Sequence, residues 1–192
     1  MPVGDSITVG YPWNKGGYRA PLLAALHAEG WKGSFAGTQG VNEQVSGRCT
    51  AYCGWNVERL SQVAPAAAAV YHPEIILLLA GINDCHPEDA PAPITINHIC
   101  SLVAAMHASD PKAVIYVASL TPCTGSNERL SLAKAARINA LLPSAVSRYS
   151  HMRYVDMYHA SKLKPCDLPD GLHPNVRRYG MIAAAWLHAL HT

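Results

Sequence analysis

The feature that most constrains the fold is an uninterrupted apolar run over residues 75–80 (IILLLA). A Pro-Glu pair at 73–74 precedes the run, and the turn-like stretch Gly-Ile-Asn-Asp at 81–84 follows it. A short apolar run between turn signals is typical of a strand that is buried on both faces, as in parallel sheets covered by helices. Even when it is extended to Ile82, the run is far too short to cross a bilayer, so we expect no membrane partner.

The rest of the chain alternates between short apolar segments and longer segments with apolar residues at helical spacing. Strands are predicted over residues 1–3, 34–37, 75–80, 113–120 and 154–157. Helices are predicted over 18–29, 94–109, 128–149 and 175–191. A further helix is predicted to begin after an N-cap at Asn56 and to run through Leu60, with a break or kink at Pro65. Such alternation indicates βαβ units and a parallel sheet with helices on both faces. A chain of 192 residues without a visible linker is expected to form one domain over residues 1–192.

The polar residues that follow the strands are expected to converge, because ligands in folds of this kind bind at the carboxyl ends of the strands. Ser6 follows the first strand, Gly54 lies in the region of the second, Asn83 follows the third, and Asp170 and His173 follow the last. Nucleophilic acyl transfer uses a hydroxyl, an imidazole and a carboxylate, and N–H donors stabilise the oxyanion that forms. Asp170 and His173 are three residues apart on one loop, so the carboxylate can hold one ring nitrogen while the other faces Ser6.

At these positions the sequence resembles the SGNH (GDSL-type) hydrolases, and the resemblance extends over essentially the whole chain. The matching motifs, in the family's order, are Gly4-Asp5-Ser6, Gly54, Gly81-Ile82-Asn83-Asp84 and Asp170-Gly171-Leu172-His173, which look like blocks I, II, III and V. The resemblance implies an α/β fold, a three-layer α/β/α sandwich around a five-stranded parallel sheet. It also implies a nucleophile at Ser6, a base at His173 and an orienting carboxylate at Asp170. The implied oxyanion hole consists of Ser6 N–H, Gly54 N–H and the Asn83 side chain.

A finer resemblance concerns the carbohydrate esterases. The stretches MPVGDSITVG, GGYRAPL, SFAGTQ, CGWNVERL and DGLHPN are similar to those of carbohydrate esterase family 3, notably its acetylxylan-esterase-like members. One position departs from that pattern, because Cys53 stands where those proteins have a serine before the block II glycine. The resemblance implies a serine esterase that deacetylates carbohydrate, such as acetylated xylan, through an acyl-enzyme on Ser6. Two alternatives remain open: a short-chain aryl, lipid or thioester hydrolase of the same fold, and a catalytically inactive carbohydrate-binding protein.

Other side chains near these motifs carry secondary predictions. Tyr11, Trp13 and Trp55 lie in loops beside the site and either form a platform for a sugar ring or pack under the Gly-rich loop. Asp5 and Asp84 are interpreted as hydrogen-bond acceptors that hold their loops. The predicted chemistry needs no cofactor and no metal; the histidines at 86, 98 and 107 form no convincing ligand set, and a structural calcium is left open.

Six cysteines are an even number and a high count for a reduced cytosolic protein. Together with the family resemblance they predict a secreted, extracellular protein, although no signal peptide is present in this chain. The favoured disulfide is Cys123–Cys166, because both lie in loops that flank the site, and the remaining pairs are then Cys49–Cys53 and Cys85–Cys100. The alternative is a set of free buried thiols. Lys and Arg number 15 against 13 Asp and Glu, without a basic cluster beyond Arg177-Arg178, so we expect no binding to nucleic acid. A monomer is also expected.

Overall fold

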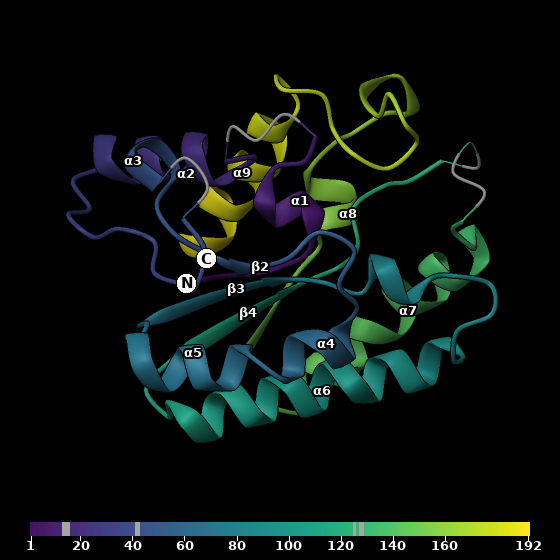
Figure 1. The fold of residues 1–192 in the computed structure, drawn as a ribbon, viewed down its shortest axis with the longest axis horizontal. Helices are drawn as coiled ribbons and strands as arrows, with labels where there is room; N and C mark the ends of the chain where they lie inside the picture. The colour runs from purple at the N-terminus through teal and green to yellow at the C-terminus, as the bar shows by residue number, and fades with distance from the viewer. Residues whose placement is uncertain (13–15, 41–42, 125, 127–128) are drawn as a thin grey trace.

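A computed structural model describes residues 1–12, 16–40, 43–124, 126 and 129–192. At its centre lies a five-stranded sheet in the order β2-β1-β3-β4-β5, and every neighbouring pair is parallel (Figure 1). The strands are β1 (Pro2–Gly4), β2 (Thr50–Ala51), β3 (Ile75–Leu79), β4 (Val114–Ala118) and β5 (Met152–Val155). The predicted five-stranded parallel sheet is therefore confirmed.

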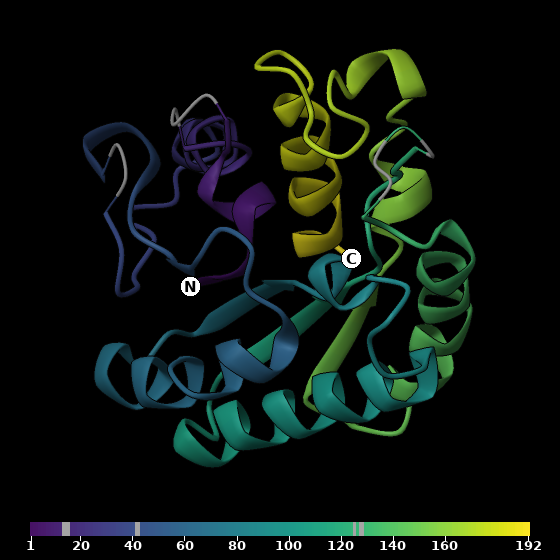
Figure 2. The ribbon, with the colours of Figure 1, turned by 45° about the vertical axis from the view of Figure 1, so that its right-hand side comes forward.

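Helices cover both faces of this sheet. They are α1 (Ser6–Val9), α2 (Arg19–Ala28), α3 (Glu43–Ser46), α4 (Val57–Ser61), α5 (Ala64–Tyr71), α6 (Ala92–Ser109), α7 (Leu132–Val146), α8 (Met157–Ala160) and α9 (Tyr179–Leu190), with 3-10 helices η1 (Ile82–Asp84) and η2 (Pro165–Asp167). One layer consists of α4, α5, α6 and α7, and the opposite layer contains α1, α2, α8 and α9 (Figures 1 and 2). The molecule is the three-layer α/β/α sandwich that the sequence predicts.

The apolar run that predicted a central strand forms β3, between β1 and β4. Its side chains from Ile76 to Leu79 are almost completely buried, because helices of both layers pack against the sheet. The same apolar core includes Leu22 of α2 and Trp186 of α9 from one layer and Leu102 of α6 from the other. Burial of each such side chain typically stabilises the fold by about 1.5–3 kcal/mol. No helix among the described residues is both long and apolar enough to span a bilayer.

The second strand lies at a different place from the prediction. Residues 34–37 are not part of the sheet; β2 is Thr50–Ala51, which pairs with Val3 and Gly4 of β1. The segment 34–37 instead runs alongside the approach to β2, where the Arg48 N–H donates to the Phe35 carbonyl (2.9 Å). Glycine at position 37 allows this, because a side chain there would overlap the Cys49 backbone. Gly54 therefore follows β2 by only three residues, which places it near the carboxyl end of that strand.

Several element boundaries also differ from the predictions. The last strand is Met152–Val155 rather than 154–157, since Asp156 caps α8 by accepting from the His159 N–H (3.2 Å). The long helix predicted over 128–149 is α7, Leu132–Val146, and Pro143 lies inside it without ending it; residue 128 is outside the described part of the chain.

Asn56 caps α4 as predicted, accepting from the Arg59 N–H (3.0 Å). The break comes after Ser61, ahead of Pro65, which occupies the first turn of α5, where proline is tolerated.

All six cysteines are described, and all are free, so the three predicted disulfides are wrong. The loops after β3 and β4 are neighbours, and they bring Cys123 close enough to Cys85 for the two thiols to interact electrostatically. Burial is nevertheless the main reason why the pKa of Cys85 rises to about 12. The thiols are free, as in the alternative prediction, but only Cys49 and Cys85 of the six are buried.

Candidate active site

Ser6, His173 and Asp170 meet at the carboxyl edge of the sheet, as predicted. Ser6 is the first residue of α1, directly after β1, and its Oγ lies 2.8 Å from His173 Nε2. His173 Nδ1 lies 2.6 Å from Asp170 Oδ2. Ser6 is only 5% exposed, so its hydroxyl is held in this arrangement by its surroundings. A hydroxyl, an imidazole and a carboxylate in this order can activate the hydroxyl as a nucleophile.

The turn that presents Ser6 depends on both residues before it. Asp5 caps α1, and its side chain accepts from the Ile7 N–H (2.9 Å). Gly4 lies so close to β3 and α1 that an added Cβ would be 2.3 Å from the Leu79 carbonyl oxygen and 2.4 Å from Thr8 Oγ1. A side chain at position 4 would therefore force the Leu79 carbonyl or Thr8 to shift where the chain passes from β1 into α1.

The loop that carries His173 is organised by Asp170. Its Oδ1 accepts from the backbone N–H groups of His173 (2.7 Å) and Leu172 (3.1 Å), while Oδ2 faces the imidazole. Partial burial raises the pKa of Asp170, but these hydrogen bonds outweigh it and hold the pKa below its ordinary value. A carboxylate accepts only, so the proton on the facing nitrogen belongs to His173 Nδ1 and leaves Nε2 as a base toward Ser6.

The candidate oxyanion donors lie on the turns after β1, β2 and β3. Among the described residues, the N–H groups of Ser6 and Gly54 have no hydrogen-bond acceptor, so both are available to a ligand. Gly54 has a φ of +75°, a conformation that favours glycine. Asn83, in η1, donates one amide proton to the Trp55 carbonyl (3.0 Å) and keeps a second one free. The three groups named by the sequence are thus positioned on neighbouring turns.

Asp84 and Asp5 serve as hydrogen-bond acceptors of their loops, as predicted. Asp84 Oδ2 accepts from the Val57 N–H at the start of α4 (3.1 Å). Burial raises the pKa of Asp84 above its ordinary value. Burial also raises the pKa of Asp5 from 3.8 to about 7, with a further increase from the charge of Asp84, against the opposing hydrogen bond from Ile7.

Aromatic side chains border the site on two sides. Trp55 stacks on Tyr52 with ring centroids 4.0 Å apart, and Tyr52 in turn bonds Thr38 through its hydroxyl (2.9 Å between oxygens). The Tyr11 ring contacts the His173 ring edge-on at 4.8 Å. Trp13, the other predicted contact, lies outside the described residues.

Sequence reasoning missed Tyr52 and Tyr179, the latter bonding the Tyr11 backbone. The spacing Tyr-x-x-Trp beside the block II glycine was the available signal for Tyr52.

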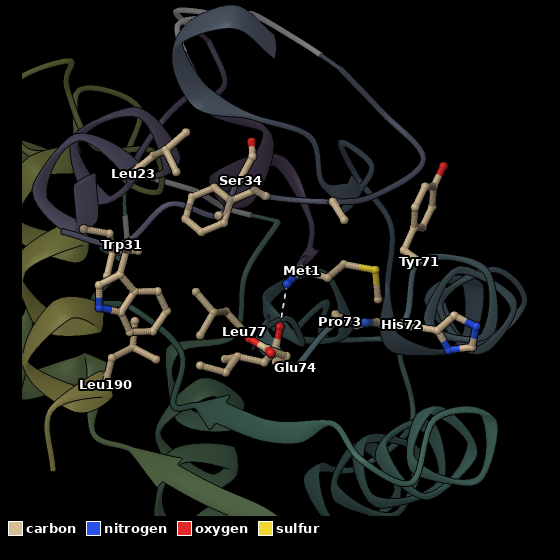
Figure 3. A pocket seen from close by; sticks show the side chains of 15 residues that line it. Met1, Leu23, Trp31, Ser34, Tyr71, His72, Pro73, Glu74, Leu77 and Leu190 are labelled. Atoms are coloured by element: carbon tan, nitrogen blue, oxygen red, sulfur yellow. Dashed lines mark hydrogen bonds between the residues drawn. The ribbon is translucent and has the colours of Figure 1, made fainter.

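No three His, Cys, Asp or Glu side chains of the described residues are grouped as metal ligands. A mainly apolar pocket lies elsewhere, lined by residues such as Met1, Trp31, Pro73 and Leu190 (Figure 3). Met1 and Pro73 precede β1 and β3, whereas Ser6 and Asn83 follow them, so this pocket lies at the opposite edge of the sheet.

Comparison with solved structures supports the fold. A carbohydrate esterase family 3 protein from Talaromyces cellulolyticus superposes with a TM-score of 0.85 at 20% identity, covering 100% of this chain and 95% of that chain. An acetyl esterase mutant with an acetate ion gives 0.85 at 19% identity, with the same coverage. A family 3 carbohydrate esterase from Clostridium thermocellum gives 0.79 at 22% identity, covering 100% and 98%.

No curated protein matches the chain by sequence. The model of the GDSL-like lipase/acylhydrolase family, however, matches residues 3–180, from the first strand to the start of α9. The matched range includes all of the candidate site residues: Ser6, Gly54, Asn83, Asp170 and His173. The chain therefore belongs to the GDSL-like lipase/acylhydrolase family, and this membership indicates an ester hydrolase.

Proposed function

We propose that this protein is a serine esterase that removes acetyl groups from carbohydrate, with Ser6 as the nucleophile. The observation that carries the proposal is the continuous hydrogen-bonded array from Ser6 Oγ through His173 to Asp170, with separations of 2.8 and 2.6 Å. The triad needs only these three side chains for attack, and the adjoining turns supply N–H donors for the oxyanion.

The proposed reaction has two half-reactions on the same groups. Ser6 Oγ attacks the ester carbonyl carbon while its proton passes to His173 Nε2, and the carbonyl oxygen becomes an oxyanion. Ser6 N–H, Gly54 N–H and the free Asn83 amide proton stabilise this oxyanion, each donor contributing about 3 kcal/mol. His173 then gives its proton to the departing alcohol oxygen, which leaves an acetyl group on Ser6. A water molecule deprotonated by His173 attacks that group and releases acetate, and the proton returns to Ser6 Oγ.

Carbohydrate acetate is favoured as the substrate class by two observations. Structures described as carbohydrate esterase family 3 proteins and as an acetyl esterase share this fold over the whole chain. The stacked Tyr52 and Trp55 rings, both partly exposed beside Gly54, offer aromatic surface of the kind on which sugar rings pack.

The test compares Ser6→Ala with wild type on an aryl acetate and on acetylated xylan, with acetic acid release as the measurement. We expect the Ser6 variant to lose activity on both substrates by at least about 10⁴-fold. Ser147→Ala is the matched control, because that serine is exposed at the end of α7 and its hydroxyl donates to the nearby Ser144 carbonyl (3.1 Å). Full activity in a folded Ser6→Ala protein would disprove the proposed mechanism.

An acyl-chain series from acetate to octanoate, including a thioester, separates the proposed substrate from the alternatives. A sharp preference for acetate, with acetic acid released from xylan, supports the proposal. Preference for longer acyl chains or for the thioester assigns the same site to a different hydrolase. Binding of xylan without turnover of any ester indicates a carbohydrate-binding protein.

A further inference from the structure

Tyr11 is an exposed aromatic residue that the triad chemistry does not use. Its ring contacts the His173 ring edge-on, with centroids 4.8 Å apart and planes inclined at 63°. His173 is largely covered, whereas Tyr11 keeps 44% of its surface exposed. The Tyr11 side chain therefore contacts the imidazole with one part of the ring and presents the rest to solvent beside it.

Buried groups from other parts of the chain hold Tyr11 in this place. The Tyr179 hydroxyl donates to the Tyr11 carbonyl oxygen (2.6 Å), and Tyr179 is only 2% exposed at the start of α9. Gly10, directly before Tyr11, has a φ of +97° and lies so close to Gly17 that an added Cβ would be 2.2 Å from the Gly17 nitrogen. The turn at Gly10 and the bond from Tyr179 together fix the backbone from which the Tyr11 ring reaches His173.

The chemistry of the triad defines what must lie beside His173. The proton that His173 takes from Ser6 is delivered to the leaving oxygen, so that oxygen has to come within hydrogen-bond reach of Nε2. The alcohol part of the ester is attached to that oxygen and therefore leaves past the imidazole. The proposed oxyanion donors Gly54 and Asn83 lie on turns other than the one that carries Tyr11. A hydrogen bond from Asn83 to the Trp55 carbonyl joins these two turns to each other.

We propose that Tyr11 is a specificity-determining residue that contacts the alcohol part of the substrate, with Tyr179 as its positioning residue. The preferred alcohol is a pyranose, whose C–H face packs on an aromatic ring and whose hydroxyls can bond the Tyr11 phenol. This choice of sugar rests on the proposed function, whereas the assignment of Tyr11 to the alcohol side rests on its contact with His173.

The experiment measures kcat/KM of Tyr11→Ala on three acetates that differ only in their alcohol: an acetylated methyl xyloside, benzyl acetate and ethyl acetate. We expect the loss on the two ring-bearing acetates to exceed the loss on ethyl acetate by about tenfold, because ethanol has no ring to stack. Tyr11→Phe keeps the ring and should retain most of the discrimination. Tyr179→Phe removes only the hydrogen bond to the Tyr11 backbone and should shift the same ratio in the same direction, by less.

Tyr158 provides a matched control, because it also contacts a neighbouring histidine edge-on, at 5.0 Å, and is likewise 44% exposed. Tyr158→Ala should leave all three rates unchanged. An equal loss on all three acetates in Tyr11→Ala would mean that Tyr11 acts only by orienting His173, and no loss would mean that it contacts no part of the substrate; either result overturns the proposal. Wild-type turnover of benzyl and ethyl acetate but not of the acetylated sugar would refute the carbohydrate proposal, while the benzyl-to-ethyl ratio would still test Tyr11.

Discussion

Asp5, which caps α1 directly before Ser6, makes the stability of the protein depend on pH. Burial raises the pKa of this carboxyl from 3.8 to about 7 in the folded protein, so the folded state retains a proton that the unfolded chain releases. Between these two values the unfolded state binds fewer protons, and stability falls as pH rises. At about 1.4 kcal/mol per pKa unit, the interval from 3.8 to about 7 corresponds to a contribution of about 4 kcal/mol. This contribution is fully present below about pH 4 and is lost by about pH 7.

The assay compares urea unfolding of wild type and Asp5→Asn from pH 4 to pH 8. Asparagine is neutral at every pH and can still cap α1 by accepting from the Ile7 N–H. We therefore expect the stability of wild type relative to the variant to decline by about 4 kcal/mol between pH 4 and pH 7.5. The matched control is Ser147→Ala, on an exposed position at the end of α7, which changes no titratable group, so its difference from wild type should stay constant across the range. A wild-type-minus-Asp5→Asn difference that stays flat across the range would refute the reasoning.

Two further predictions concern Asn83, a proposed oxyanion donor, and Gly4, in the turn before Ser6. Asn83→Ala removes one proposed oxyanion donor and leaves the Trp55 carbonyl without its bond from Asn83. We expect kcat on an aryl acetate to fall by about 10²–10³-fold, with the fold retained by circular dichroism, and a loss below about threefold would exclude Asn83 from the oxyanion hole. Gly4→Ala forces a Cβ against the Leu79 carbonyl and Thr8, so we expect it to lower the free energy of unfolding by about 1–3 kcal/mol, measured in urea, whereas Gly33→Ala, where an added Cβ meets nothing, should change it little.

The central sheet and the triad could be predicted because their signals are local. The run that forms β3 is apolar on both faces, and a strand between two helical layers needs that pattern. Ser6, Asn83 and His173 each follow a strand, and parallel strands bring their carboxyl ends to one edge whatever the exact boundaries are. Errors of one or two residues in the boundaries of β1, β3, β4 and β5 therefore did not displace the predicted site.

The features that sequence reasoning missed depend on contacts between distant segments. The strand Thr50–Ala51 is defined by pairing with β1, about fifty residues away, and its two residues carry no apolar pattern of their own. The cysteine count could suggest three disulfides, but which loops are neighbours follows from the β3–β4 pairing, which brings Cys85 toward Cys123. Tyr179 fits the apolar pattern of α9, so the sequence gives no sign of its polar role. That role follows from the position of Tyr11, whose carbonyl accepts from the Tyr179 hydroxyl.

Contacts between distant segments also make cysteine at position 53 compatible with the proposed site. Cys53 is exposed, and the turn is held by its neighbours: the Trp55 N–H donates to the Tyr52 carbonyl (3.2 Å) and Asn83 bonds the Trp55 carbonyl (3.0 Å). Asp84, next to Asn83, holds the start of α4 by accepting from Val57. Apart from the Tyr52 carbonyl, the groups that form these bonds lie on the C-terminal side of Gly54. None of the bonds uses the side chain at position 53. The Tyr52 N–H also donates to the Gly4 carbonyl (3.2 Å), so β1 and the loop after β3 hold this turn from both sides of Gly54. We therefore expect that either serine or cysteine at position 53 leaves the orientation of the Gly54 N–H in place.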